Sequence, residues 1–427
     1  MILITSLFII LTFFSLKISV FLSSYQDRKF HLSAILVFTM LQVFMVNIGL
    51  FISVILYQNY HEEFLIILIS TFFLNLGALI IGKPKPVRIS RTYNQTVFNR
   101  NILLLGYVMV VVILLYTMGD IIFYFIQFIK ESVSGNVIGA INILAESRRD
   151  FSFSSGGNGV VTEFKNIILV FLTIYIIASN FKWYLKSIIV TITVLFLLST
   201  GQRWPLFEAL LVYIVFITYS KQVYFNRKKI FLYGLMGYSV FFVISYFTPR
   251  FGMSENVVDN IYMNFEAVNY RLFVSQNLTS LYIFDLIPYS LDFGWGRYIM
   301  KDVGTILPGY QEGFASFIYR LTHSGKAGSA SFSSLTGFYA DFAYLGVIVS
   351  FIYGMVIQLY SRLVFVKSTS DHRRIFHAFL VVAIATTSLG SIVGIISHGL
   401  LSGFLMFKLL SLLLKPIKQH PLLSKKI

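Results

Sequence analysis

The chain has 427 residues, of which 57% are hydrophobic and only 12% are charged, and its formal net charge is +16. A soluble protein carries about a quarter charged residues, whereas this chain has apolar runs of bilayer-crossing length along its whole sequence. The composition excludes an ordinary soluble domain, and the runs are too long for the alternating strands of a membrane β-barrel. The absence of cysteine excludes disulfides, thiolate metal sites and cysteine nucleophiles.

The first apolar run, residues 2–22, is predicted to be a membrane helix rather than a signal peptide. It lacks a basic stretch before it and a small-residue cleavage site after it. Ten further runs follow, so the predicted fold class is an all-α polytopic integral membrane protein, with residues 1–427 in a single transmembrane domain. The predicted spans are 2–22, 32–57, 64–82, 102–128, 164–180, 185–199, 204–220, 230–248, 335–365, 375–396 and 398–414.

The connections between these spans alternate in charge. A strongly basic set comprises 23–31, 83–101, 181–186, 221–229, 366–374 and the tail 415–427. The other set is slightly acidic and comprises 58–63, 129–163, 200–203 and 249–334. Because basic loops stay in the cytoplasm, the N-terminus is predicted to be outside and the C-terminus inside. The positive charge is then a topology signal and predicts no nucleic-acid partner.

Two long connections, 129–163 and 249–334, are predicted to lie outside and to serve as substrate-binding elements. A connection as long as 249–334 is unusual unless it is functional or disordered. This one is rich in aromatic residues and has a helical pattern over 259–283. It is therefore predicted to be ordered, to lie partly on the membrane surface and to cover the outer ends of the helices.

The predicted outer segments carry several arginines, whose planar donor groups suit phosphate oxygens. Arginines from separate loops that converge at the outer leaflet would form a pyrophosphate clamp; alternatively, they pair with acidic residues of the large loop. Arg203 and Arg250 stand at helix ends beside apolar sequence, where an idle charge is costly. The candidate binding residues are Arg148, Arg149, Arg203, Arg250, Arg271 and Arg320, and Arg297 is a further arginine of the large loop.

Three other residues are candidates for site chemistry. Glu208 follows Arg203 by five residues and is predicted to neutralise and orient it rather than to act in catalysis. His323 in "HSGKAGSASF" could take a proton from a hydroxyl or bind phosphate, or it could be an ordinary loop histidine. Asp341 lies inside a predicted span, where a carboxylate is either functional or paired with an arginine. Because nucleotide and metal motifs are missing, no cofactor and no metal are predicted.

Two segments resemble the O-antigen polymerase family, the Wzy-type polymerases that join oligosaccharide repeat units. "STGQRWPLFEALL" (Ser199–Leu211) is similar to the family's glycine–arginine turn before an apolar helix. "LTGFYADFAYLGVIVSF" (Leu335–Phe351) is similar to the segment after the family's large loop, with a kink at "LG". The architecture of many spans and a large outer loop before the last three spans extends the resemblance over most of the chain.

The resemblance implies a metal-independent, glycosyltransferase-type polymerase in the bacterial cytoplasmic (inner) membrane, with its site facing the periplasm. Its substrates would be undecaprenyl-pyrophosphate-linked oligosaccharides, and its product O-antigen or capsular polysaccharide. Arg203 and Arg250 would hold the pyrophosphate, and His323 or Asp341 would be the base. The other candidate arginines would bind donor or acceptor, with a chain-length regulator and a flippase as candidate protein partners in the lipid bilayer.

Three alternatives stay open from the sequence. An O-antigen ligase has a similar layout and a histidine late in the large loop, as in His323-Ser324 here; the segment "TGFYADFAYLG" favours the polymerase. A flippase of lipid-linked oligosaccharides would need polar residues along the spans in both halves, whereas the arginines here gather in outer loops. A non-catalytic assembly partner would not require so many outer arginines.

Overall fold

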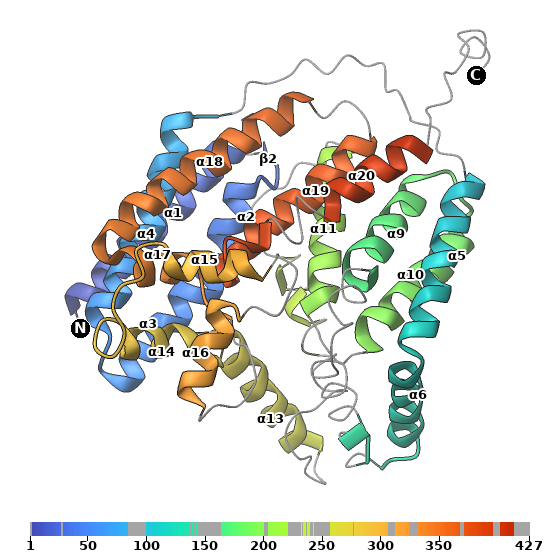
Figure 1. Ribbon diagram of the computed structural model, residues 1–427, viewed down its shortest axis with the longest axis horizontal. Helices are drawn as coiled ribbons and strands as arrows, with labels where there is room; N and C mark the ends of the chain where they lie inside the picture. Colours follow the sequence, from blue (N-terminus) through green and yellow to red (C-terminus); the bar gives the residue numbers. More distant parts are fainter. Residues whose placement is uncertain are drawn as a thin grey trace.

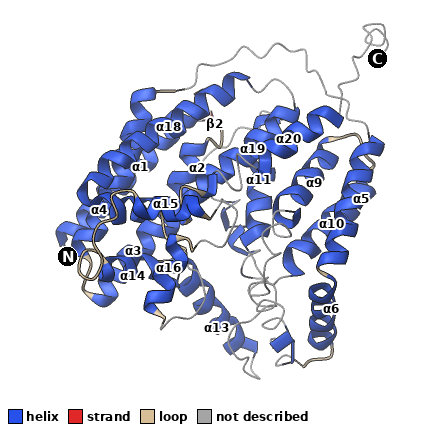
Figure 2. Cartoon of the chain, viewed as in Figure 1, coloured by secondary structure: helices blue, strands red, loops and turns tan. Residues whose placement is uncertain are grey.

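The structure is a computed structural model in which the described residues are almost entirely helical (Figure 2). Its only strands among the described residues are a short antiparallel pair, β1 (Ser24–Gln26) and β2 (Lys29–Phe30). The predicted helical fold class is therefore confirmed. The structure describes residues 2–26, 29–83, 100–136, 139–140, 142–143, 164–199, 204–220, 232, 234–235, 237–239, 242, 257–275, 277–305, 312–323, 331–367, 371–395 and 402–413.

Three regions of helices follow one another along the chain. The first contains α1 (Ile2–Ser23), α2 (Ala34–Leu41), the π-helix η1 (Gln42–Asn47), α3 (Ile48–Tyr57), α4 (His61–Ile81), α5 (Arg100–Thr117) and α6 (Gly119–Val133). The second contains the π-helix η2 (Phe164–Ile168), α9 (Leu169–Ala178), α10 (Trp183–Ser199), α11 (Trp204–Ser220), α13 (Val257–Asn269), the π-helix η3 (Tyr270–Ser275), α14 (Leu278–Leu286), α15 (Arg297–Gly304) and α16 (Phe314–Thr322). The third contains α17 (Ser334–Phe342), η4 (Ala343–Leu345), α18 (Gly346–Lys367), α19 (Asp371–Thr386), η5 (Thr387–Leu389) and α20 (Ser402–Leu413).

Several of these helices are suited to a bilayer. Among the described residues, five helical segments are long and apolar enough to cross a membrane: Ile2–Ser23, Ala34–Tyr57, His61–Ile81, Arg100–Thr117 and Ser334–Leu363. Shorter apolar helices cover parts of four further predicted spans: Lys165–Ala178, Trp183–Ser199, Trp204–Tyr219 and Gly403–Leu412. Of the predicted span 230–248 and the predicted loop 129–163, most residues lie outside the described part of the chain.

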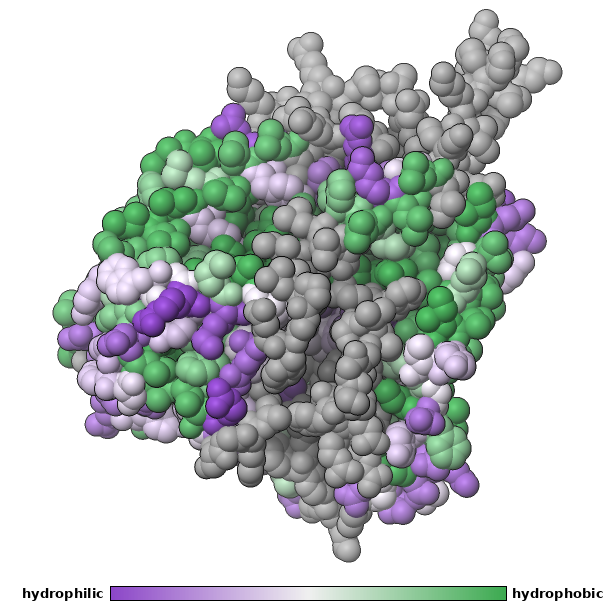
Figure 3. Space-filling model, viewed as in Figure 1, coloured by the Kyte–Doolittle hydropathy of each residue, from purple (hydrophilic) through white to green (hydrophobic). Residues whose placement is uncertain are grey.

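The helices form two packed groups with a third between them (Figure 1). Helices α1, α4 and α18 pack on one side, and α5, α9 and α10 pack on the other. Between these groups, α19 contacts both α2 and α11. On the face shown in the space-filling view, apolar surface dominates the upper left, where α18 lies, and much of the right side, where α5 lies (Figure 3). Exposed apolar side chains on α1 and α5, such as Ile9 and Val112, fit a lipid-facing surface.

Helices α4 and α18 approach each other through glycine. A Cβ atom at Gly77 would lie 2.0 Å from the backbone oxygen of Phe351. A Cβ atom at Gly354 would lie 1.8 Å from the backbone oxygen of Leu74. Small residues that let helix backbones touch are the usual basis of helix association in membranes, where apolar side chains gain little by leaving lipid.

A chain of buried polar side chains crosses the middle of the bundle. Gln42, about two turns after the start of α2, donates to Asn47 at 3.0 Å and accepts from the Ser333 hydroxyl at 2.7 Å. The Asn47 amide in turn donates to Thr71 of α4 at 3.2 Å. Polar side chains at this depth are tolerated because each finds a partner. They join η1, α4 and the segment before α17 in one network.

Three predicted spans differ from the helices observed. The predicted span 102–128 is two helices, α5 and α6, which separate at Met118–Gly119. The span 335–365 bends at Ala343, which has a φ of +52°. The span 375–396 ends its α-helix at Thr386, and Gly390 is extended. In that segment, Thr386 and Thr387 hydroxyls bond carbonyls three residues back, which competes with the helix.

The predicted outer segment 249–334 contains α13, η3, α14, α15 and α16, so its predicted helical pattern over 259–283 is confirmed. This segment packs on the apolar helices rather than extending away from them. Asn277 donates to the backbone oxygen of Met45 in η1 at 2.9 Å. Ser280 of α14 pairs with Thr336 of α17 at 3.2 Å. Because Asn277 is buried, its Asn-Leu-Thr sequence cannot serve as a glycosylation acceptor in the folded chain.

Stability is expected to fall at acidic pH because of His31, which is buried between β2 and α2. Burial lowers the pKa of His31 from 6.5 to about 4. Between these pH values His31 is protonated in the unfolded chain and neutral in the folded chain. The stabilisation is complete above about pH 6.5 and is lost as the pH falls towards 4, by up to about 3 kcal/mol. Thermal midpoints in nanodiscs from pH 7.5 to 4.5 should fall less steeply for His31→Gln than for the native chain; parallel curves would contradict the assignment.

Candidate functional site

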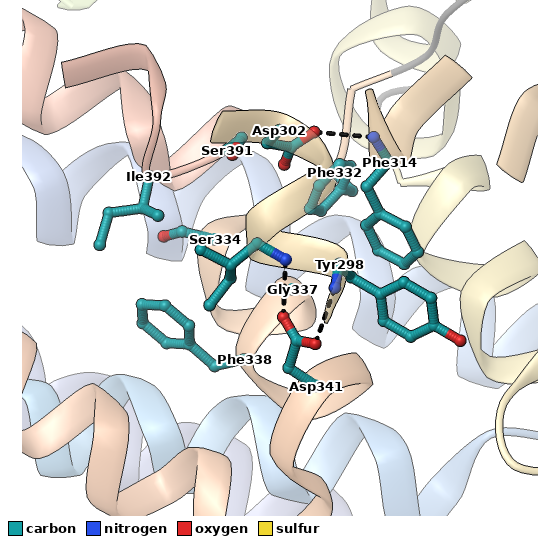
Figure 4. Close-up of a pocket in the computed structure, with 11 residues that line it drawn as sticks. Tyr298, Asp302, Phe314, Phe332, Ser334, Gly337, Phe338, Asp341, Ser391 and Ile392 are labelled. Carbon is teal, nitrogen blue, oxygen red and sulfur yellow. Dashed lines mark hydrogen bonds between the residues drawn. The ribbon is translucent and has the colours of Figure 1, made fainter. Parts of the chain in front are cut away.

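Asp341 holds the loop before α15 in place. One carboxylate oxygen accepts the backbone N–H groups of Gly296 and Tyr298 at 2.9 and 3.0 Å, and the other accepts that of Ile299 at 2.9 Å. These are the first N–H groups of α15, which have no partner within the helix. A carboxylate there also suits the positive end of the helix dipole. Figure 4 shows Asp341 pointing at the start of this helix.

A second buried carboxylate, Asp302 at the end of α15, repeats this arrangement on the next helix. Its side chain accepts the backbone N–H of Phe314, the first residue of α16, at 2.7 Å. Burial raises the pKa of Asp302, while hydrogen bonds from the Ser391 hydroxyl and the Phe314 N–H oppose that shift. Asp302 therefore links α15 and α16 to the interrupted end of α19.

A small pocket lies between these two carboxylates (Figure 4). Its cavity volume is about 10 Å³, which is room for about one water molecule. Its wall includes Tyr298, Phe314, Phe338 and Ser391 besides the acids. The Ser334 hydroxyl also lines it and has no hydrogen-bond partner among the described residues. Two carboxylates would repel an anion, so this pocket is unsuited to pyrophosphate and suits water or a neutral polar group.

The two predicted bases have separate surroundings. Asp341 is fully buried and bonds three backbone N–H groups, so it has a structural role, and its role as a base stays a prediction. His323 ends α16 and is half-buried. Its ring stacks on Tyr319 at a centroid distance of 3.9 Å and meets Tyr282 edge-on at 5.6 Å. Its Nδ1 lies 2.9 Å from the Thr322 hydroxyl.

Arg320 pairs with an acidic residue of the same segment, as one alternative from the sequence anticipated. Its guanidinium makes two hydrogen bonds of 2.8 Å to the two carboxylate oxygens of Glu312. The Arg320 guanidinium holds the pKa of the half-buried Glu312 carboxyl below its ordinary value. A pair of this kind, with the Arg320 side chain exposed, contributes about 1 kcal/mol or less to stability. Arg320 would have to leave Glu312 to bind a substrate with its whole donor face.

Two further candidates lie on helices. Arg271 is half-buried in η3, which packs on α3. Glu208 is half-buried in α11, one turn after Trp204 and Pro205 begin this helix. Proline in the first turn is favourable because its missing N–H would have no helical partner there. Arg148, Arg149, Arg203 and Arg250 lie outside the described residues, so most of the predicted pyrophosphate clamp does too.

Two features of the site were missing from the sequence prediction. Asp302 carried no motif that set it apart from other loop acids. The "GWG" sequence at 294–296 did carry a turn signal, and the structure places Trp295 there with a φ of +50°. Within the part of the chain that the structure describes, no three His, Cys, Asp or Glu side chains gather as metal ligands would. Comparison of the chain with known protein families, curated proteins and solved structures gives no match.

Proposed function

We propose that the chain is a polymerase of lipid-linked oligosaccharide repeat units, acting at the outer face of a bacterial cytoplasmic membrane. The proposal includes eleven spans, an outside N-terminus and a cytoplasmic C-terminus. The donor would be a glycan on undecaprenyl pyrophosphate, and the acceptor a sugar hydroxyl of the next lipid-linked unit. The enzyme would need no metal, because arginines can stabilise the charge of the leaving pyrophosphate.

The observation that carries the proposal is the position of the arginines along a helical membrane chain. Seven arginines stand in segments whose low net charge predicts an outside location, while the basic excess stands in the opposite connections. The packing of α14 against α17 and of η3 against α3 adds support, because it gives these two parts of the long segment fixed positions against the apolar helices. A fixed position is what a clamp assembled from several loops requires.

Arg203 gives the sharpest test of this function. The short turn before α11 would hold it at headgroup level, beside the free N–H groups that begin the helix. Arg203→Lys is expected to reduce polymer about tenfold or more, because lysine keeps the charge but loses the planar fork. Glu208→Gln should have a milder effect. The measurement is the glycan ladder in a deletion strain that expresses each variant at equal membrane level.

The same strain separates the candidate functions. Loss of a polymerase leaves a single repeat unit on the final acceptor, whereas loss of a ligase leaves the acceptor bare. Normal ladders with Arg203→Ala at normal protein level would reject the pyrophosphate role of this arginine. Normal ladders in the deletion strain itself would reject the polymerase.

A transporter of lipid-linked oligosaccharides is a second candidate, favoured by the interruption of α19. Broken helices beside polar side chains line substrate sites in many transporters. Here the break at Gly390 lies next to Ser391, which bonds Asp302. Movement of a fluorescent lipid-linked oligosaccharide across reconstituted vesicles would favour the transporter. Chain extension without such movement would favour the polymerase.

A further inference from the structure

Trp295 is held in an unusual state. Its side chain is 66% exposed, and its backbone adopts a φ of +50°, which is costly for a bulky residue. Folding normally removes large aromatic side chains from water and keeps their backbones in relaxed regions. Trp295 is both exposed and strained, so the surrounding structure must hold its backbone in this conformation.

The surrounding contacts leave the Trp295 backbone no freedom. Its N–H donates to the backbone oxygen of Asp341 at 2.7 Å, while the Gly294 N–H donates to that of Ala340 at 3.0 Å. A Cβ atom at Gly294 would lie 2.1 Å from the Asp341 carboxylate, so only glycine fits before Trp295. The Arg297 side chain bonds the backbone oxygen of Gly294 at 3.1 Å. The exposed indole is therefore mounted on a rigid loop.

Two more exposed aromatic residues stand in the segments next to this loop. Tyr344 follows Asp341 by three residues and is 69% exposed, and Tyr289 is 78% exposed. Both lie within electrostatic range of the Tyr339 hydroxyl in α17. Tyr344 comes directly after Ala343, a second residue with positive φ. We call Tyr289, Trp295 and Tyr344 the aromatic platform.

Carboxylates stand near Tyr339 as well. Glu62 and Glu63, at the start of α4, are within electrostatic range of the same Tyr339 hydroxyl. Asp285 accepts a 2.7 Å hydrogen bond from the Tyr60 hydroxyl, in the turn that leads into α4. Flat aromatic faces bind the apolar faces of sugar rings, and carboxylates accept hydrogen bonds from the hydroxyls at their edges.

We propose that the aromatic platform binds sugar rings of a glycan by stacking, with Trp295 as its main contact. The inference rests on the proposed function and deepens it, because it gives the neutral part of the lipid-linked substrate its own binding surface. Tyr289 and Trp295 stand in the segment before α15 and Tyr344 in η4, whereas Arg203 precedes α11 in the sequence. Sugar and pyrophosphate would thus be held by different parts of the chain.

Aromatic residues also anchor membrane proteins at the lipid headgroups, and this is the competing explanation. An anchor gains nothing from a strained backbone, because an indole at the interface is effective in many orientations. A stacking surface does gain, because a fixed ring loses less entropy on binding. Neighbouring carboxylates also favour sugar hydroxyls over lipid phosphates, which they would repel.

The decisive variant is Trp295→Asn, measured on the full chain in nanodiscs. Asparagine tolerates positive φ, so removal of the indole should relieve strain, and the thermal midpoint should stay equal or rise. The probe is a set of soluble oligosaccharides released by mild acid from the host strain's own surface polysaccharide, with binding measured by calorimetry. We expect about tenfold weaker binding for Trp295→Asn and near-native binding for Trp295→Phe.

The matched control is Trp183→Asn. Trp183 is exposed like Trp295, at 78%, but it lies at the start of α10. It should leave sugar binding unchanged. A second measurement places brominated lipids around a chain in which Trp183 and Trp204 are replaced by phenylalanine. Unquenched emission from Trp295 that responds to sugar supports the platform, whereas quenched emission without a sugar response overturns it in favour of a lipid anchor.

A lower thermal midpoint for Trp295→Asn with unchanged sugar binding would also overturn the platform, because the indole would then be structural. The proposed function is decided separately. Normal glycan ladders in the deletion strain reject the polymerase whatever the purified chain binds. Loss of the ladders in that strain, together with sugar binding that ignores Trp295→Asn, keeps the polymerase and rejects the platform.

Discussion

Replacing Gly354 with leucine is expected to prevent stable folding of the membrane bundle. Even the first added carbon would lie 1.8 Å from the Leu74 backbone oxygen, and a backbone atom of a long helix cannot rotate away. Helices α4 and α18 would have to separate. They would lose their packing along the whole contact, including the close approach of Gly77 to Phe351. The loss should exceed about 4 kcal/mol, in the range reserved for severe core damage.

The measurement is the thermal midpoint of the purified chain in detergent, together with its level in the membrane. Gly119→Leu is the matched control, because a Cβ atom there meets nothing within 4 Å. It should leave both quantities nearly unchanged. Gly77→Leu should repeat the effect of Gly354→Leu, since its Cβ atom would meet the Phe351 oxygen at 2.0 Å. A Gly354→Leu protein with a native thermal midpoint would show that the two helices are not in contact there.

Asp341→Ala is expected to release α15 from α17. It would leave the N–H groups of Gly296, Tyr298 and Ile299 without acceptors in a largely buried place. Each unsatisfied group costs about 1–3 kcal/mol, so a total loss of about 3–5 kcal/mol is expected after local relaxation. Asp341→Asn should be intermediate, because one oxygen remains while the amide NH₂ faces a backbone N–H.

Hydrogen exchange separates this structural role from a catalytic one. Peptides that cover 294–304 should exchange much faster in Asp341→Ala, while peptides from α1 and α4 should keep their protection. Asp302→Ala is the comparison, because it should loosen α16 at Phe314 and leave the start of α15 protected. Unchanged exchange over 294–304 together with loss of glycan ladders would instead make Asp341 a base.

Some helices could be predicted well from the sequence because hydrophobic length alone defines them. Residues 2–22, 32–57 and 64–82 were predicted, and the structure has helical segments over Ile2–Ser23, Ala34–Tyr57 and His61–Ile81. In a bilayer an unpaired backbone group is so costly that a long apolar run must be helical. The same reasoning failed at 375–396, where hydroxyl groups and Gly390 end the helix early beside α15 and α17. A hydropathy average over about 20 residues does not detect so short an interruption of the helix.

Site residues were harder to predict because their roles depend on partners far away in sequence. Arg320 and Glu312 are near in sequence, and their pairing was among the alternatives considered. Asp341 was singled out as a carboxylate in an apolar segment, and its catalytic role stays a prediction. Its partners at 296–299 follow only from the way the loop folds back. Gly354 gave no signal, because the close approach of α4 exists only once both helices are packed.

By itself, therefore, the sequence determined that this chain is a helical membrane protein, and it assigned most of the long helices. Both conclusions rest on local apolar content, which water and lipid sort without reference to distant residues. Only the tertiary structure decided which carboxylates are helix caps, where two glycines let α4 and α18 touch, and that Trp295 is exposed under strain. These features depend on contacts between segments up to several hundred residues apart. The free energy of such contacts cannot be derived from any one segment of the sequence.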